Sequence, residues 1–164
     1  MQYARRLSQS FPKRSSKVDI QPEKELFLRV VQDTKGKKLF LQYLQKINKM
    51  EQYYFYENVM TFKRTLKQLE EDKITVSPDK LRQASSRIID SYVKDGASMF
   101  IPIDITCKLD ILQRFESGEI KSDLFDEALD DHLMKLGNLI SKEFMKSEEG
   151  QKYVDAQFSA FESF

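Results

Sequence analysis

Residues 48–72 read NKMEQYYFYENVMTFKRTLKQLEED, and the spacing of apolar side chains in this stretch decides the fold class. Phe55, Val59, Phe62, Leu66 and Leu69 follow one another at alternating steps of four and three residues. This period places all five side chains on one face of a helix. The stretch therefore predicts a long amphipathic helix with a continuous buried seam.

The start of this helix determines which polar side chains can face a partner. Asn48 followed by Glu51 is the pattern of a capping box, so we expect the helix to begin near residue 49. Glu57 and Asn58 then lie more than one turn inside the helix, beside the seam. We interpret this pair as a solvated helix face, with a functional surface as the alternative.

The remaining segments also have helical spacing, and no strand alternation stands out. We expect helices over 22–33, 37–47, 81–93, 104–118, 124–147 and 149–164, with TKGK (34–37) as a break after the first. Ser77 and Pro78 have the residue types of a helix N-cap and first position. Gly137 is predicted to mark a kink or junction. The side chains expected to be buried include Ala84, Leu109, Phe125, Leu136, Ile140, Phe144, Tyr153, Phe158 and Phe161.

Composition agrees with an all-α domain. The chain has 164 residues, of which 40% are apolar and 32% are charged, with five Gly and four Pro. This length suits a single domain with one core. One cysteine, Cys107, allows no internal disulfide, and one histidine, His132, does not complete the common zinc patterns. We therefore expect no cofactor and no metal. The single cysteine also suits a protein of the reducing cytosol.

Charge is unevenly distributed along the chain. The formal net charge is +1, but residues 1–19 alone carry +4 and residues 143–164 carry −3. We divide the chain into a basic, flexible lead (1–19) and a folded domain (20–164). The near-neutral middle does not suggest a nucleic-acid footprint. The lead suits weak contact with anionic lipid, although a disordered tail is the interpretation that composition favours.

No constellation for covalent or acid–base chemistry is present. Asp130, Asp131 and His132 are adjacent, but neighbouring helical residues point about 100° apart and do not converge on one atom. We interpret them as a solvated helix face rather than a metal or acid–base site. Cys107 follows a helix start, which could lower its pKa. Burial as a small apolar residue is the preferred interpretation.

Four stretches in order resemble the regulator of G-protein signalling (RGS) domain, over roughly residues 22–155. They are LFLQYLQKINKMEQYYFYENVMTFKR, SPDKLRQASSRIIDSYV, FIPIDITCK and FDEALDDHLMKLGNLISKEFMKS. Phe55-Tyr56 takes the place of the usual Phe-Trp, and Phe125 and Phe144 have the usual spacing. The resemblance implies an all-α RGS-like bundle of about nine helices with a long antiparallel helix pair.

The resemblance also implies a surface that binds a Gα subunit of a heterotrimeric G protein. It falls on Glu51, Gln52, Phe100, Pro102, Ile103, Asp104, Lys135, Leu139, Ile140 and Glu143. In this register Glu51-Gln52 takes the place of the family's Glu-Asn pair, and Glu57-Asn58 is a lookalike downstream. Such domains are not conventional enzymes, so catalytic residues are not expected.

Several of these positions depart from the family pattern. Pro102 stands where an asparagine usually reaches toward the catalytic glutamine of Gα, and proline offers neither a side-chain donor nor a backbone N–H. Leu139 replaces an aspartate, and Glu143 replaces an arginine. These changes predict poor activity toward ordinary Gα subunits unless the switch regions of the partner differ as well.

Two interpretations therefore stay open. In the first, the chain is a divergent RGS domain that binds active Gα and accelerates its GTP hydrolysis. In the second, it is a non-activating interaction or scaffold module of a larger signalling protein. In both cases we expect a cytoplasmic monomer, and recruitment to the inner face of the plasma membrane belongs to the alternative in which residues 1–19 contact anionic lipid.

Overall fold

The computed structural model describes residues 21–162. The basic lead predicted for residues 1–19 lies outside the described residues. Seven α-helices are present in the described part, together with a π-helical turn (Ile89–Val93) and a 3₁₀ turn (Phe144–Lys146). The helices are α2 (Pro22–Gln32), α3 (Thr34–Lys46), α4 (Met50–Glu71), α5 (Pro78–Ile88), α6 (Ile105–Ser117), α7 (Asp126–Lys142) and α8 (Glu148–Glu162). The all-α class is confirmed, whereas the expected count of about nine helices is not matched.

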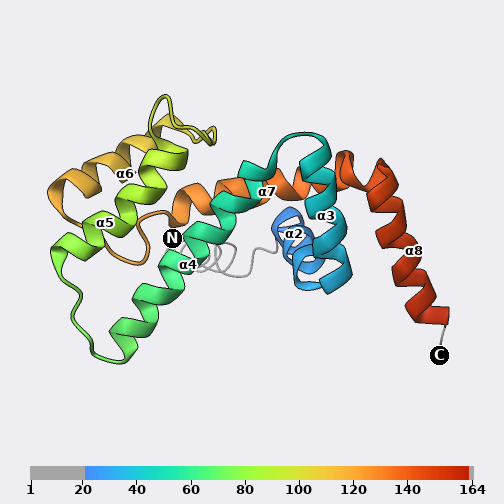
Figure 1. Cartoon of the computed structure of the whole chain (residues 1–164), viewed down its shortest axis with the longest axis horizontal. Coiled ribbons are helices and arrows are strands. Elements are labelled where there is room, and N and C mark those ends of the chain that lie inside the picture. The colour runs from blue at the N-terminus through green and yellow to red at the C-terminus, as the bar shows by residue number, and fades with distance from the viewer. Residues whose placement is uncertain (1–20, 163–164) are drawn as a thin grey trace, which may run out of the picture.

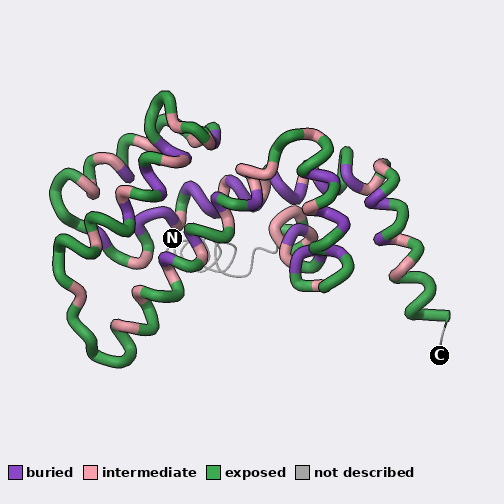
Figure 2. The backbone as a smooth tube through the Cα atoms, viewed as in Figure 1, coloured by how far each residue is buried: buried purple, intermediate pink, exposed green. Residues whose placement is uncertain are grey.

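Helix α7 occupies the middle of the molecule (Figure 1). Helices α4, α5 and α6 lie on one side, with α5 running back beside α4, while α2, α3 and α8 lie on the other. Helix α7 contacts α2, α4 and α6, so it connects both sides. Figure 2 shows buried positions along α7 and the facing parts of its neighbours, and exposed positions along the end of α8.

The seam predicted for α4 forms part of the core. Phe55, Val59 and Phe62 are buried, while Leu66 and Leu69 near the far end are half-buried. The Phe62 ring meets the Phe125 ring edge-to-face, with centroids 5.2 Å apart, and so joins α4 to the start of α7. Aromatic pairs in this geometry add stability beyond the area that they bury.

The start of α3 and the cap of α4 differ from the prediction, whereas the start of α4 near residue 49 and the cap of α5 agree with it. The chain breaks at Asp33, whose carboxylate accepts from the Gly36 N–H at 2.7 Å, so TKGK begins α3 instead of separating two helices. The capping box is also wrong: α4 starts after Lys49 without a side-chain cap, and Asn48 adopts a left-handed φ of 58°. The Ser77 hydroxyl accepts from the Lys80 N–H, as the predicted cap requires.

Burial differs from the prediction at several positions. Ala84 is exposed and Ser85 is buried instead, because the Ser85 hydroxyl donates to the Leu81 carbonyl and so is not left unpaired. Leu109 is exposed because α6 turns its Cys107 face inward. Phe158 and Phe161 are also exposed, at 63% and 73%, on the part of α8 that extends away from the body (Figure 1).

Gly137 does not interrupt α7, which is continuous from Asp126 to Lys142. Its role is close packing against α2. A Cβ atom at this position would lie 2.0 Å from the carbonyl oxygen of Glu23, far inside van der Waals contact. The absence of a side chain therefore lets the two helices approach closely, and the predicted kink is wrong.

Candidate functional site

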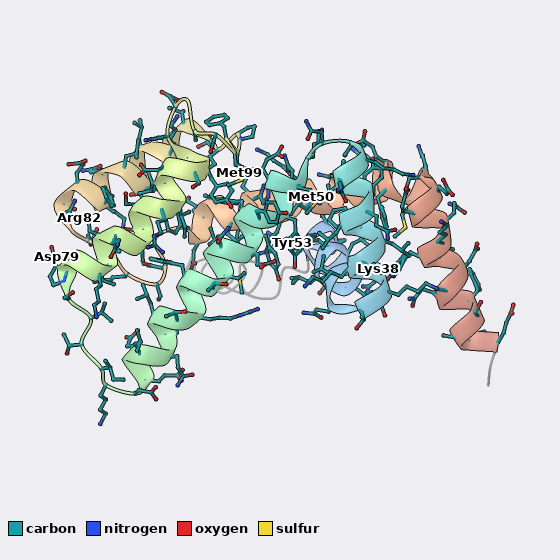
Figure 3. All side chains as sticks on the ribbon, in the orientation of Figure 1. Lys38, Met50, Tyr53, Asp79, Arg82 and Met99 are labelled. Carbon is teal, nitrogen blue, oxygen red and sulfur yellow. The ribbon has the colours of Figure 1, made fainter. Side chains whose placement is uncertain are left out.

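Three segments meet around one open depression at the middle of the molecule: the first turn of α4, the connector 94–104, and α7. Met50 and Met99, labelled in Figure 3, mark the first two of these segments. Five of the predicted site residues line the depression, and we call them the candidate surface: Gln52, Pro102, Lys135, Leu139 and Glu143. Five other residues also line it: Lys49, Ile101, His132, Asn138 and Lys142.

Backbone hydrogen bonds hold the first turn of α4 against the end of α3. The Lys49 N–H donates to the Leu44 carbonyl at 2.8 Å, and the Gln52 N–H donates to the Lys49 carbonyl at 3.1 Å. Glu51 and Gln52 are half-buried in this turn. Glu51 precedes Gln52 but does not itself line the depression.

The connector is irregular, as predicted, and is fixed to the helical turn before it. The Met99 and Ile101 N–H groups donate to the Ser91 and Tyr92 carbonyls at 3.0 and 2.9 Å, and Ile101 is fully buried. Pro102 is thereby presented at the surface. A connector anchored in this way can offer a rigid surface to a partner.

The other predicted connector residues have separate environments. Asp104 caps α6, accepting from the Thr106 N–H at 3.1 Å, and Ile103 is half-buried against the core. Phe100 is 43% exposed, and the Lys108 ammonium lies 5.5 Å from its ring centroid. A cation over an aromatic face is an attractive contact, so this arrangement favours one orientation of the Phe100 ring.

Helix α7 contributes Lys135 and Leu139 from one face, and Glu143 follows its last residue. The Lys135 ammonium donates to the Pro102 carbonyl at 3.3 Å and pairs with Asp131 at 3.0 Å. Ile140, predicted as a contact residue, is fully buried in the core. Ile140 therefore cannot contact a partner directly, because α7 turns position 140 away from the depression.

His132 is the clearest departure from the sequence-based interpretation. It is only 2% exposed, and its Nε2 lies 2.6 Å from the Gln52 carbonyl oxygen. A carbonyl oxygen can only accept, so Nε2 carries the proton. Burial lowers the pKa of His132 to about 4, opposed by this hydrogen bond. The periodicity held the signal: position 132 follows Leu129 by three residues and precedes Leu136 by four, as a buried residue does.

Glu57 and Asn58 lie outside the depression. Both are exposed, and the Asn58 side-chain amide donates to the Tyr92 hydroxyl at 2.7 Å and to the Tyr54 carbonyl at 2.8 Å. The solvated-face interpretation of this pair agrees with the structure. The Asn58 contact with Tyr92 also links α4 to the end of the α5 segment.

The remaining candidates for chemistry have structural surroundings. Burial raises the pKa of the Cys107 thiol, which agrees with the preferred interpretation of this residue. Within residues 21–162, no three His, Cys, Asp or Glu side chains are grouped so that they could hold a metal ion. Among the described helices, none combines the length and apolar character needed to cross a bilayer.

The candidate site joins the first turn of one helix, a connector and one face of a second helix around an open depression. The sequence profile described as the regulator of G protein signaling domain matches residues 26–153, and the chain belongs to this family. The family regulates G-protein signalling, and its domains generally bind Gα subunits as regulators rather than as conventional enzymes. A comparison with curated proteins finds no match to the chain.

Proposed function

We propose that this chain binds the switch regions of a GTP-loaded Gα subunit through the candidate surface, with Glu51, Phe100 and Asp104 at its edges. The observation that carries the proposal is that the first turn of α4, the connector and α7 border one depression. The family match supports Gα as the class of partner.

The domain would accelerate GTP hydrolysis by giving the switch regions of Gα a rigid surface to bind. Gα carries its own arginine and hydrolyses GTP at about 10⁻² s⁻¹, so the remaining gain comes from holding its switches and its water-positioning glutamine in the reactive arrangement. Such support needs surface groups that do not move when the transition state forms. The Lys135 bond to the Pro102 carbonyl and the backbone bonds of Met99 and Ile101 supply this rigidity.

Single-turnover GTP hydrolysis by a panel of Gα subunits, with and without the domain, tests the activating role. We expect acceleration with at least one subunit, in proportion to domain concentration up to saturation. The matched control is Glu57→Ala, which changes an exposed α4 side chain outside the depression. No acceleration with any subunit would remove GTPase activation from the proposal.

The second candidate is a non-activating interaction module with the same fold. It is favoured by Pro102, which has no donor to offer the Gα glutamine, and by Leu139 and Glu143, which replace an acid and a base of the family pattern. Pull-down with Gα in its aluminium-fluoride state separates the two candidates. Tight binding selective for that state supports the activating form, and its absence favours the scaffold.

Charge around the depression suggests which partner suits this chain. Lys49, Lys135 and Lys142 line it against one acidic residue, Glu143, although residues 21–162 together carry 22 basic and 25 acidic side chains. An excess of lysine at one place on a mildly acidic domain favours a partner with an acidic surface. The panel should therefore include Gα subunits whose switch regions carry extra carboxylates.

A further inference from the structure

The first turn of α4 lacks the side-chain cap that its sequence suggests. Lys49 occupies the cap position without a side-chain hydrogen bond, and Asn48 before it is in the left-handed region. Uncapped helix starts fray, because their first N–H groups have no partners in the helix. Glu51 and Gln52 lie in this turn, which the backbone bonds of Lys49 and Gln52 hold only at its start.

The side chain of His132, on α7, adds a second contact to this turn through the Gln52 carbonyl rather than through an uncapped N–H. Its Nε2–H donates to the Gln52 carbonyl at 2.6 Å, and its ring packs edge-on against Phe55, with centroids 5.1 Å apart and planes at 88°. The imidazole therefore touches two successive parts of α4, one through a hydrogen bond and one through an aromatic contact. Because it is almost fully buried, water cannot readily replace that donor.

The same face of α7 also holds the connector. Lys135, one turn after His132, donates to the Pro102 carbonyl. His132, Lys135 and Leu139 follow at steps of three and four residues, and all three line the depression. One face of a single helix thus bonds to the backbone of both other segments.

We propose that His132 is a positioning residue, whose bond to the Gln52 carbonyl fixes the first turn of α4 so that Glu51 and Gln52 are presented to the partner. The role in presenting Glu51 and Gln52 to a partner rests on the proposed function. The fixing of the first turn of α4 by His132 does not depend on any partner.

Two substitutions separate the hydrogen bond from the volume of the ring. In His132→Gln, the side-chain amide keeps an N–H donor at a reach similar to that of Nε2. In His132→Leu, the site stays filled with an apolar group but loses the donor. Ile120→Val is the control for general destabilisation, since Ile120 is buried and lines a separate depression at the other end of α4.

Amide hydrogen exchange measures the turn without any partner. The N–H groups of residues 54–56 take their helical acceptors from residues 50–52, so their exchange reports opening of the first turn. We expect exchange there to be about tenfold faster in His132→Leu than in the wild type, and nearly unchanged in His132→Gln and Ile120→Val. Equal exchange in the wild type and His132→Leu would overturn the inference.

Binding to Gα in the aluminium-fluoride state then tests the purpose of the fixed turn. We expect about tenfold weaker binding for His132→Leu and a change of less than about threefold for His132→Gln. Faster exchange without loss of affinity would overturn the role in presentation. If the wild type binds no Gα subunit, the proposed function fails, whereas the exchange result still decides whether His132 fixes the turn.

Discussion

Glu51 and Glu57 lie on the same helix but in different surroundings. Glu51 is half-buried in the first turn of α4, next to Gln52 at the depression, whereas Glu57 is exposed six residues further on. Their contrast offers a matched pair of substitutions. It tests the helix register directly, because both changes remove the same carboxylate.

We expect Glu51→Ala to weaken Gα binding by about tenfold or more without changing the unfolding temperature, and Glu57→Ala to change neither quantity appreciably. Affinity for Gα in the aluminium-fluoride state and thermal unfolding by circular dichroism measure the two effects. Similar losses from both substitutions would mean that the register assigned to α4 is wrong.

His132 makes the stability of the domain depend on pH. Its pKa is about 4 in the folded chain and near 6.5 when exposed, so the folded state disfavours protonation. This contribution is complete above about pH 6.5 and is lost as the pH falls toward 4. The difference between the pKa values of His132 in the unfolded and folded chain corresponds to about 3 kcal/mol in the free energy of unfolding.

Urea unfolding at pH 7.5, 6 and 5 measures this dependence for the wild type and for His132→Gln. Between pH 7.5 and 5, we expect the wild type to lose about 2 kcal/mol more than the variant, because glutamine does not titrate. Carboxylates titrate in both proteins, so the difference between the two curves isolates the histidine. Parallel curves would show that His132 does not stay neutral in the folded state.

Position 132 shows what the sequence could predict at the scale of single residues. The spacing from Leu129 and Leu136 favours burial, whereas the adjacent Asp130 and Asp131 favour solvent, and in the structure the spacing decides. Ser85 was missed for a related reason, since its burial depends on a hydroxyl bond to its own helix. The spacing of apolar residues does not reveal a hydroxyl whose hydrogen bond to its own helix allows it to be buried.

At the scale of helices, the contact between α2 and α7 depends on Gly137. A methyl group there would meet the main chain of Glu23, which cannot move aside as a flexible side chain could. We expect Gly137→Ala to cost about 3 kcal/mol or more in the free energy of unfolding, although alanine favours helix. Chemical denaturation measures this cost.

Asn138→Ala is the matched control, since position 138 is half-buried on the same helix. Its expected effect on the free energy of unfolding is below about 1 kcal/mol. A stabilised Gly137→Ala variant would contradict the close approach of the two helices.

The register of α4 and α7 could be predicted because long seams have a strong period. Phe55, Phe62, Phe125 and Phe144 are all buried as expected. Shorter elements were predicted less well: α6 buries Cys107 and Ile111 rather than Leu109. Which face of a short helix turns inward depends on neighbours that are distant in sequence, and these cannot be read from its own pattern.

At the scale of the whole molecule, α7 contacts helices on both sides, and its loss should remove the fold rather than one part of it. A chain that ends at Ser117 leaves α2 and α4 without this partner, and we expect no cooperative thermal transition. A chain that ends at Ala156 keeps the buried Tyr153 and loses the exposed Phe158 and Phe161, so it should unfold cooperatively. Circular dichroism and calorimetry compare the two, and a cooperative transition in the shorter chain would contradict the central role of α7.

The pairing of α2 with α7 also governs how the protein can be made. Helix α2 leaves the ribosome before its partner surface on α7, which is translated about a hundred residues later. During that interval the buried side chains of α2 remain uncovered, which invites chaperone binding and aggregation. Slow translation of the segment between α2 and α7 would lengthen this exposure, so the yield of folded protein in cells should depend on how quickly α7 is completed.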